Sequence, residues 1–318
     1  MSKPLCLILA GGLSHERDVS LRSGRRVAEA LSEAGCAVEI TDLSTDLLPR
    51  LTHANPSRRP DIVWPLLHGA SGEDGSIQGV LELLGYRYLG SAPGPCRAAW
   101  NKTVAKSVVA HAGLATPPFV TLPQSLFQEL GAAALLDLVS TRFGLPVVVK
   151  PVHGGSALGV NLVTEASRLS QALMECFAYS SVALIERAVS GMELAVSVVD
   201  LGEGPFALPA VEIVTDGAYD YDARYNPGRA EFFAPARLSD TQVTAVGETA
   251  THAHQALGLV RLSRIDMILD PAGHLWFLEA NVSPGMQETS LLPQAALAGN
   301  YPLPRLYRTL VEASIAND

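Results

Sequence analysis

Near the carboxyl end of the chain, four polar side chains have the types and the spacing that metal-assisted phosphoryl transfer requires. They are Arg264, Asp266, Glu279 and Asn281. The first two lie in a run with strand character, residues 262–269, and the other two lie in a second run, residues 274–281. The turn sequence Asp270-Pro271-Ala272-Gly273 joins the runs and predicts an antiparallel hairpin. Because side chains alternate along a strand, the two polar residues of each run share a face.

The length of the turn predicts how these residues face each other across the hairpin. A four-residue loop pairs Leu269 with His274. The register that follows is Arg264 opposite Glu279, Asp266 opposite Phe277 and Leu262 opposite Asn281. In that register Glu279 and Asn281 share their face with Leu275 and Phe277. We therefore expect two carboxylates, one amide and one arginine to converge on one face of the hairpin.

Two carboxylates and an amide oxygen on a rigid hairpin suit Mg²⁺, a hard cation that prefers oxygen ligands and often shares itself with substrate phosphates. Glu279 can bridge two ions, with Asp266 on one and Asn281 on the other, as two-metal phosphoryl transfer needs. The alternative is a solvated face on which opposite charges pair across the strands. The turn Ser283-Pro284-Gly285 directly after Asn281 favours a functional site, because it directs backbone N–H groups toward the same place.

A glycine-rich segment upstream is a second candidate site. The valines at 147–149 predict a buried strand that delivers Lys150 to its end, and residues 153–159 follow with three glycines among six residues. Closely spaced glycines bring backbone N–H groups together as a cradle for a polyanion such as a nucleotide phosphate. The alternative is a plain glycine hairpin. The Walker pattern is excluded because no Gly-Lys-Ser/Thr follows.

Residues 219–228 form a polar and aromatic segment without regular periodicity. Long irregular segments inside compact domains are often lids that exclude water from an active site. The alternative is an ordinary surface loop. We expect a lid over residues 215–231.

Metal sites built from cysteine and histidine are not indicated. The four cysteines are scattered at positions 6, 36, 96 and 176 and form no Cys-x-x-Cys pair, so a zinc cage and a disulfide framework are both unsupported, and a reducing cytoplasm fits. His252 and His254 lie in a predicted helix, residues 241–257, where residues two apart point in different directions. We expect both histidines to be surface residues.

Short apolar runs alternate with amphipathic stretches over the first ninety residues. The runs 5–10, 37–41 and 62–67 predict strands, and residues 20–34 predict a helix. This βαβ rhythm predicts a parallel sheet and an α/β fold. The turn Gly11-Gly12 lacks Gly-x-Gly-x-x-Gly spacing, so a nicotinamide dinucleotide site is not expected. After a Gly/Pro-rich turn at 90–95, a new helix is expected over residues 98–112.

Composition sets the remaining limits. The chain has 318 residues, 48% hydrophobic and 17% charged, which is typical of a soluble globular protein of two or three domains. A net charge of −9 offers no basic surface for nucleic acid. The longest stretch without charged side chains, residues 107–128, contains three prolines and is unlike a membrane span. The apolar run 4–10 is better explained as a buried first strand than as a secretory signal.

Five stretches spread over nearly the whole chain combine into a specific set of motifs. They are Gly11-Gly12 with Glu16 to Ser20, His68-Gly69 with Gly72 to Gly75, Lys150-Pro151 with Gly155-Ser156, Tyr219 to Tyr225, and Glu279 to Asn281 through Ser290-Leu291. In this combination the sequence resembles the ATP-grasp ligases, and among these the D-alanine:D-alanine ligase family. Any one stretch alone would be weak evidence for this resemblance.

The resemblance implies a three-domain ATP-grasp fold of the α/β class. An N-terminal pre-ATP-grasp domain with a Rossmann-like parallel sheet would span residues 1–90. A central ATP-grasp subdomain would span residues 91–185, and a C-terminal domain carrying the metal and substrate sites would span residues 186–318. The nucleotide site would lie between the central and C-terminal domains. The family resemblance also suggests a homodimer.

Roles for individual residues in nucleotide and metal binding follow from the same resemblance. The ATP phosphates would be held by Lys102, Lys150 and Arg224. The adenine would be bordered by Glu186, Arg187, Ala188 and Val189, and the ribose would be held by Glu193. Two Mg²⁺ ions, for which Mn²⁺ can substitute, would be bound by Asp266, Glu279 and Asn281.

On the amino-acid side, the resemblance implies two substrate positions. Glu16 would fix the amine of the first D-alanine, with His68 nearby. Ser156 and Tyr225 would join Glu16 in a hydrogen-bonded set that closes the lid. The carboxylate of the second D-alanine would be bound by Ser290 and Leu291, and the oxyanion hole would be formed by Arg264 and the Gly285 N–H.

The implied activity is ATP-dependent ligation of two D-alanines through an acyl phosphate, in the cytoplasm, for peptidoglycan precursors. The sequence departs from the family pattern at Asn101, Ala157, Ala218 and Arg224. The last three departures motivate an alternative, a related ligase that joins other amino acids in specialised metabolism or inhibitor resistance. Tyr225 favours an amine over a hydroxy acid as the second substrate. A nucleotide-binding protein without ligase activity is a third hypothesis, against which the intact hairpin residues argue.

Overall fold

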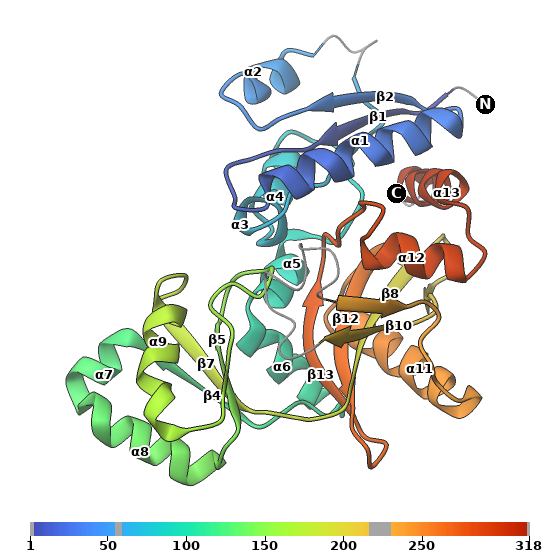
Figure 1. Ribbon diagram of the computed structural model, residues 1–318. Helices are drawn as coiled ribbons and strands as arrows, with labels where there is room; N and C mark the ends of the chain where they lie inside the picture. Colours follow the sequence, from blue (N-terminus) through green and yellow to red (C-terminus); the bar gives the residue numbers. More distant parts are fainter. Residues whose placement is uncertain (1–2, 55–58, 216–229, 317–318) are drawn as a thin grey trace.

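The computed structural model describes residues 3–54, 59–215 and 230–316, and this part of the chain forms three sheets connected and covered by helices (Figure 1). One sheet is parallel and the other two are antiparallel. The predicted α/β fold class is therefore confirmed.

The parallel sheet near the N-terminus has the strand order β2-β1-β3. Its strands are β1 (Leu5–Leu9), β2 (Ala37–Thr41) and β3 (Ile62–Pro65). The associated helices are α1 (Arg17–Glu33), α2 (Leu47–Thr52), α3 (Ala70–Glu73) and α4 (Ser76–Leu83). The central strand β1 is almost entirely buried, as expected for an apolar strand covered on both faces. The expected βαβ unit is confirmed, and its boundaries differ by only a few residues.

A four-stranded antiparallel sheet follows, in the order β4-β7-β5-β6. Its strands are β4 (Phe119–Pro123), β7 (Val182–Arg187), β5 (Val147–Pro151) and β6 (Asn161–Val163). The helices α7 (Gln124–Leu130), α8 (Ala132–Phe143) and α9 (Leu169–Phe177), with a short 3-10 turn at Ala166–Arg168, bury its apolar face (Figure 1).

A six-stranded antiparallel sheet makes up most of the carboxyl half. Its main path is β11-β10-β8-β12-β13, and β9 pairs with β8. The strands are β8 (Met192–Asp200), β9 (Pro205–Ala207), β10 (Val211–Thr215), β11 (Ala230–Phe233), β12 (Leu262–Leu269) and β13 (Leu275–Asn281). The helices around it are α5 (Pro93–Trp100), α6 (Lys102–His111), α11 (Asp240–Ala256), α12 (Leu291–Ala298) and α13 (Leu303–Ala316).

The carboxyl-terminal helices join this sheet to the N-terminal sheet. Helix α13 lies against α1 (Figure 1), and the Arg308 Nη1 atom donates to the Ala34 carbonyl at 2.7 Å. The rings of Tyr307 and Trp64 meet edge to face, with centroids 5.5 Å apart. One buried cluster contains side chains from both sheets and from α1. The Gln287 side chain donates to the Val19 carbonyl at 3.3 Å, which holds the start of α1 beside the loop that follows β13.

The helix expected over residues 98–112 is instead two helices, which corrects the prediction. Asn101 lies between α5 and α6 in an extended conformation, and its side-chain oxygen accepts the Val104 N–H at 3.1 Å. Asparagine is a strong N-cap residue because its side chain satisfies an N–H at the start of a helix. The break makes Lys102 the first residue of α6 and directs it toward the glycine-rich segment.

The hairpin register predicted from the turn is wrong. The structure pairs Leu269 with Leu275, Asp266 with Glu279 and Arg264 with Asn281, with an irregularity at the Asp266–Met267 step that leaves Leu278 as an extra residue in β13. This is the arrangement of a β-bulge. The Phe277 N–H donates to the Ala115 carbonyl at 2.8 Å, and the Phe277 carbonyl accepts the Thr116 hydroxyl at 2.9 Å. Phe277 is buried in the core, so the bulge separates it from the face that Glu279 occupies.

The expectation that both histidines of α11 lie on the surface is half wrong. His252 is exposed, but His254 is buried, and its Nδ1 atom lies 2.7 Å from the Ser263 hydroxyl of β12. Burial lowers the pKa of His254 to about 4. The helix itself is confirmed, and its N-cap is Ser239 in a capping box with Gln242.

Candidate active site

The hairpin brings the predicted polar residues together, although in a different register. Asp266 and Glu279 are direct cross-strand neighbours, and so are Arg264 and Asn281. Arg264 donates from Nε and Nη2 to the two oxygens of Asp266, at 2.7 Å each, and the Asn281 amide donates to Asp266 at 3.2 Å. Glu279 lies 3.3 Å from the Lys102 ammonium. Each carboxylate is therefore paired with a positively charged side chain, as charged groups of limited exposure require.

A cavity of about 240 Å³, here called cavity II, lies between the four-stranded and six-stranded sheets. Its polar lining consists of Lys102, Lys150, Glu186, Arg187, Glu193, Asp266 and Glu279. Its remaining lining is largely apolar and comes from both sheets and the glycine-rich segment. An apolar cavity with cations and carboxylates gathered at one place suits a ligand with a flat ring and a polyphosphate.

Lysine side chains in and beside cavity II converge on one carboxylate. Glu186 is 3% exposed, its Oε1 atom lies 2.6 Å from the Lys150 ammonium, and its Oε2 atom lies 2.7 Å from the Lys106 ammonium. Burial alone would raise the pKa of Glu186, but the charges of Lys150 and Lys106 outweigh it and hold the pKa below its usual range. Burial lowers the pKa of Lys106 to about 8, against the opposing effect of Glu186.

The glycine-rich segment lies between cavity II and the start of α1. The Lys102 ammonium donates to the Gly154 carbonyl at 2.6 Å, which ties α6 to this segment. Ser156 and Ala157 have positive φ angles of 53° and 56°, a conformation that costs energy for residues with a side chain. A Cβ on Gly155 would lie 3.1 Å from the Glu16 carboxylate, so a larger residue here would push that carboxylate by a few tenths of an ångström.

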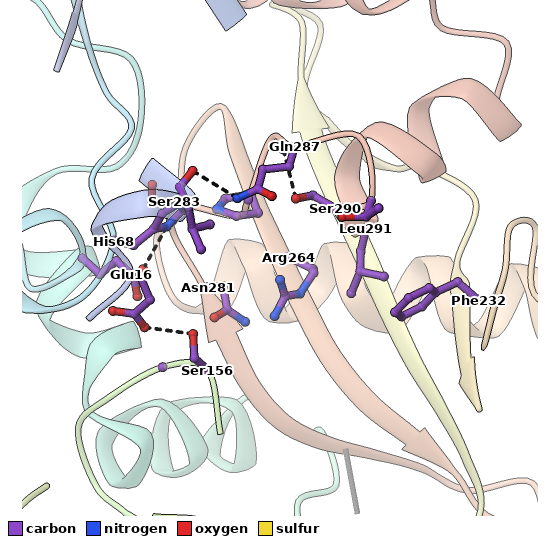
Figure 2. Close-up of a pocket in the computed structure, with 16 residues that line it drawn as sticks. Glu16, His68, Ser156, Phe232, Arg264, Asn281, Ser283, Gln287, Ser290 and Leu291 are labelled. Atoms are coloured by element: carbon purple, nitrogen blue, oxygen red, sulfur yellow. Dashed lines mark hydrogen bonds and ion pairs between the residues drawn. The ribbon is translucent and has the colours of Figure 1, made fainter. Parts of the chain in front are cut away.

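A second cavity of about 110 Å³, here called cavity I, is lined by the predicted amino-acid residues (Figure 2). The Ser156 hydroxyl donates to Glu16 at 2.9 Å on one side of it, and Ser290 and Leu291 lie on the other side, with Arg264 and Asn281 between them. A site with a carboxylate at one end and a serine beside a helix N-terminus at the other can bind an ammonium group at the first end and a carboxylate at the second.

Two buried polar atoms in cavity I support a ligand at this place. The His68 Nε2 atom and the Ser283 hydroxyl have no hydrogen-bond partner within residues 3–54, 59–215 and 230–316. Buried polar groups are nearly always paired, so such atoms in a cavity indicate a bound polar group. The other nitrogen of His68 lies 3.6 Å from the Glu73 carboxylate, whose pKa is raised by burial.

The turn after β13 is shaped by close contacts. A Cβ on Gly285 would lie 2.8 Å from the Ser290 hydroxyl, so glycine allows the two residues to approach. The Gln287 N–H donates to that hydroxyl at 3.0 Å, as Figure 2 shows. The Met286 N–H donates to Ser23 of α1 at 3.1 Å, which anchors the turn to the N-terminal helix.

Most of the predicted site residues line one of the two cavities. Gly155 lines both, and the hairpin contributes Arg264 and Asn281 to cavity I and Asp266 and Glu279 to cavity II. Ala188 does not line cavity II, and its N–H donates to the Pro146 carbonyl at 3.1 Å. Tyr225, Arg224, Ala218 and nearly all of the expected lid lie outside the described residues.

The residues that were not identified from the sequence include Glu73 and Gln287, which line cavity I, and Lys106, which lies next to cavity II. Lys106 had a usable signal, because Lys102 and Lys106 are four residues apart on one helix face. Two like charges at that spacing destabilise a helix slightly, so carboxylates near them could have been expected. Glu73 lies in the Gly72 to Gly75 motif, but a motif alone did not indicate its contact with His68.

Two negative findings concern the described residues only. No helix in this part of the chain combines the length and the apolar character needed to cross a bilayer. The same residues contain no cluster of three or more His, Cys, Asp or Glu side chains suited to a metal. The hairpin set has two carboxylates and one amide, so a metal bound there needs further oxygen ligands from outside this set.

The arrangement of the three sheets, with a lysine-lined cavity between the two antiparallel ones, defines an ATP-grasp fold. The family profile described as D-ala D-ala ligase C-terminus matches residues 108–312, and the profile described as D-ala D-ala ligase N-terminus matches residues 39–91. The chain belongs to the D-alanine–D-alanine ligase family.

Individual relatives agree with this assignment. The D-alanine--D-alanine ligase of Bordetella petrii is 40% identical over 92% of this chain and 86% of its own length. The crystal structure of D-alanine--D-alanine ligase from Bacillus anthracis is 27% identical, with a TM-score of 0.81 over 98% of this chain and 97% of that one. The VanG D-Ala:D-Ser ligase from Enterococcus faecalis has a TM-score of 0.84 over 98% of this chain and 100% of that chain, but at 24% identity it supports the fold alone.

Proposed function

We propose that this protein joins two D-alanines into D-alanyl-D-alanine with conversion of ATP to ADP and phosphate, for peptidoglycan precursor synthesis. The observation that carries the proposal is that one hairpin supplies side chains to both cavities: Arg264 and Asn281 to cavity I, and Asp266 and Glu279 to cavity II. A nucleotide in cavity II and an amino acid in cavity I therefore meet at a single group of charges.

In the first step, the carboxylate of one D-alanine attacks the γ-phosphoryl group of ATP. An acyl phosphate forms, the bond between the γ-phosphorus and the β,γ-bridging oxygen breaks, and ADP leaves. Repulsion between the two anions is the main obstacle, so positioning and charge neutralisation supply most of the catalysis. Lys102 and Lys150 would neutralise the phosphates, while Glu16 and His68 would hold the ammonium and carboxylate of the amino acid in cavity I.

In the second step, the free amine of the other D-alanine attacks the acyl carbon, phosphate leaves with the carbon–oxygen bond pair, and the nitrogen gives up one proton to the departing phosphate or to solvent. The tetrahedral oxyanion would be stabilised by Arg264 and the Gly285 N–H, both of which line cavity I. The Ser290 hydroxyl and the N-terminus of α12, which begins at Leu291, would bind the carboxylate of this second D-alanine. Closure of the site would protect the acyl phosphate from water.

The hairpin residues fit a divalent cation. Asp266 and Glu279 face each other, and their oxygens, together with that of Asn281, are the hard donors that Mg²⁺ prefers. When bound there, the cation neutralises the charge that develops on the transferred phosphoryl group. We propose two Mg²⁺ ions, for which Mn²⁺ can substitute, with the phosphates of ATP completing the oxygen ligands. Arg264 and Lys102, which contact the two carboxylates in this structure, would remain close to the bound metal without being its ligands.

Further features of the proposal rest on the family resemblance. They are a cytoplasmic location, a homodimer, the division into domains at residues 90 and 185, a water-excluding lid over 215–231, and the roles given to Arg224 and Tyr225. Four free and buried cysteines fit a reducing compartment. The alternative of a ligase for other amino acids is not favoured, because the relatives that cover nearly the whole chain are D-alanine--D-alanine ligases.

A direct assay tests the function. The purified protein is incubated with ATP, Mg²⁺ and single D-amino acids, and phosphate release and dipeptide formation are measured. We expect turnover with D-alanine to exceed that with the other amino acids. Faster turnover with a different amino acid would fit the alternative. The absence of any dipeptide product would contradict ligase activity.

A further inference from the structure

Lys106 of α6 is a fully buried lysine that is not exposed to either cavity. Its side chain is 0% exposed, and its ammonium lies 2.7 Å from Glu186, 2.6 Å from the Thr116 hydroxyl and 5.1 Å from the centre of the Phe119 ring. It lines neither cavity I nor cavity II. A ligand in either cavity therefore cannot touch it directly.

Polar contacts fix this lysine in place. The Thr116 hydroxyl that accepts from Lys106 donates to the Phe277 carbonyl of β13, and Glu186 on β7 contacts Lys106 with one oxygen and Lys150 with the other. The hydrogen bonds and ion pairs thus run from β13 through α6 to the lining of cavity II. Burying an ammonium costs several kcal/mol, which an apolar side chain of similar length would avoid.

The charges of this group indicate what the buried lysine contributes. Lys150 and Glu186 line cavity II as a close ion pair, and a pair of opposite charges has little net attraction for a third charge. Lys106 on the far oxygen of Glu186 makes the group a triad with two positive charges and one negative charge. All three side chains are buried, so salt screens the remaining positive charge less than it would on the protein surface.

We propose that Lys106 is a positioning residue for polyphosphate: by offsetting Glu186 from outside the cavity, it leaves the charge of Lys150 available to the phosphates of the nucleotide. This inference rests on the proposed function, in which ATP occupies cavity II. It differs from a merely structural role, in which Lys106 only compensates Glu186 and the loss of Lys106 weakens every ligand equally.

The test compares a ligand with phosphates and one without. Binding of Mg·ATP and of adenosine is measured by calorimetry for the wild-type protein and for Lys106→Met, which keeps the length of the side chain and removes the charge. We expect the affinity for Mg·ATP to fall by about tenfold or more and the affinity for adenosine to stay within about twofold. Equal losses for both ligands, or no loss for either, would overturn the inference.

A second pair of variants decides the question if Lys106→Met does not fold. Glu186→Gln leaves two positive charges in the triad, and the double variant Glu186→Gln with Lys106→Met leaves one and buries no unpaired carboxylate. We expect the preference for Mg·ATP over adenosine to fall by about tenfold from the single to the double variant. The same preference in both variants would overturn the inference.

Lys150→Met separates this inference from the proposed function. If Lys150→Met leaves the affinity for Mg·ATP unchanged, the phosphate site itself is misplaced and the proposed function fails. If Lys150→Met weakens Mg·ATP binding and Lys106→Met does not, the phosphate site stands and only the role of Lys106 is refuted.

Discussion

Asp266 and Glu279 face each other directly across β12 and β13, and each carboxylate is paired with a cation from a different place in the chain. Arg264 holds Asp266 from two residues away on the same strand, while Lys102 reaches Glu279 from the start of α6. Two adjacent carboxylates repel each other unless cations are close. The pairing therefore offsets the repulsion between the two carboxylates at the point where the two cavities meet.

Replacing Glu279 by Gln removes one of these charges and keeps the shape of the side chain. We expect kcat to fall by at least about a hundredfold, because phosphoryl transfer loses a metal ligand. The thermal unfolding temperature should change little, since Glu279 is partly exposed and lies at the edge strand of the sheet. Glu312→Gln, which alters only an exposed pair with Arg308 on α13, is the matched control. Full activity in the Glu279 variant would refute the metal assignment.

Replacing Ser156 by Ala tests the contact between the glycine-rich segment and α1. The Ser156 hydroxyl donates to the Glu16 carboxylate, and a hydrogen bond to a charged group contributes about 1.5–3 kcal/mol. We expect the KM for D-alanine to rise about tenfold or more, while the KM for ATP changes less. Ser140→Ala, on the exposed face of α8, is the control. An unchanged KM for D-alanine would show that this contact does not position Glu16.

Replacing Gly285 by Ala tests the turn beside the second amino acid. The new Cβ would lie 2.8 Å from the Ser290 hydroxyl, so Ser290 has to move. A displacement of about 1 Å at a reacting group can cost about a hundredfold in rate. We expect a loss of that order in kcat/KM for D-alanine. Gly94→Ala is the control because a Cβ there meets open space. Equal activity of the two variants would show that the turn does not position the substrate.

The buried His254 makes stability depend on pH. Its pKa is about 4 in the folded protein and about 6.5 when unfolded, so between these values the unfolded chain binds more protons. The free energy of unfolding should therefore fall as the pH is lowered from about 6.5 to about 4, with His254 contributing about 2–3 kcal/mol to that fall. Denaturant unfolding at several pH values measures it. A His254→Gln variant should show a shallower dependence, and the same slope in both proteins would contradict the assignment.

Local patterns predicted much of the fold and which segments lie around the two cavities. The strands of the parallel sheet, the strand that carries Lys150, the glycine-rich segment and the carboxylate hairpin all follow from alternation, apolar runs and turn residues. These features depend on neighbours in the sequence. The gathering of two carboxylates, an amide and an arginine on one hairpin could therefore be predicted without knowledge of the packing.

The features that could not be predicted depend on tertiary contacts. The sequence of β13 reads as continuous alternation, and the bulge at Leu278 is associated with hydrogen bonds from Phe277 to Ala115 and Thr116. Only the packing of α11 on β12 buries His254 beside Ser263. Likewise, Lys106 has a carboxylate partner because β7 brings Glu186 to α6, more than seventy residues later in the sequence.

The most direct test of the proposed reaction traces a carboxylate oxygen of D-alanine into the released phosphate. D-alanine labelled with ¹⁸O in its carboxylate is incubated with the protein, ATP and Mg²⁺, and the released phosphate and the dipeptide are analysed by mass spectrometry. Attack of the carboxylate on ATP predicts one ¹⁸O in the phosphate for each D-alanyl-D-alanine formed. Unlabelled phosphate, or phosphate release without the dipeptide, would contradict the acyl-phosphate reaction at this site.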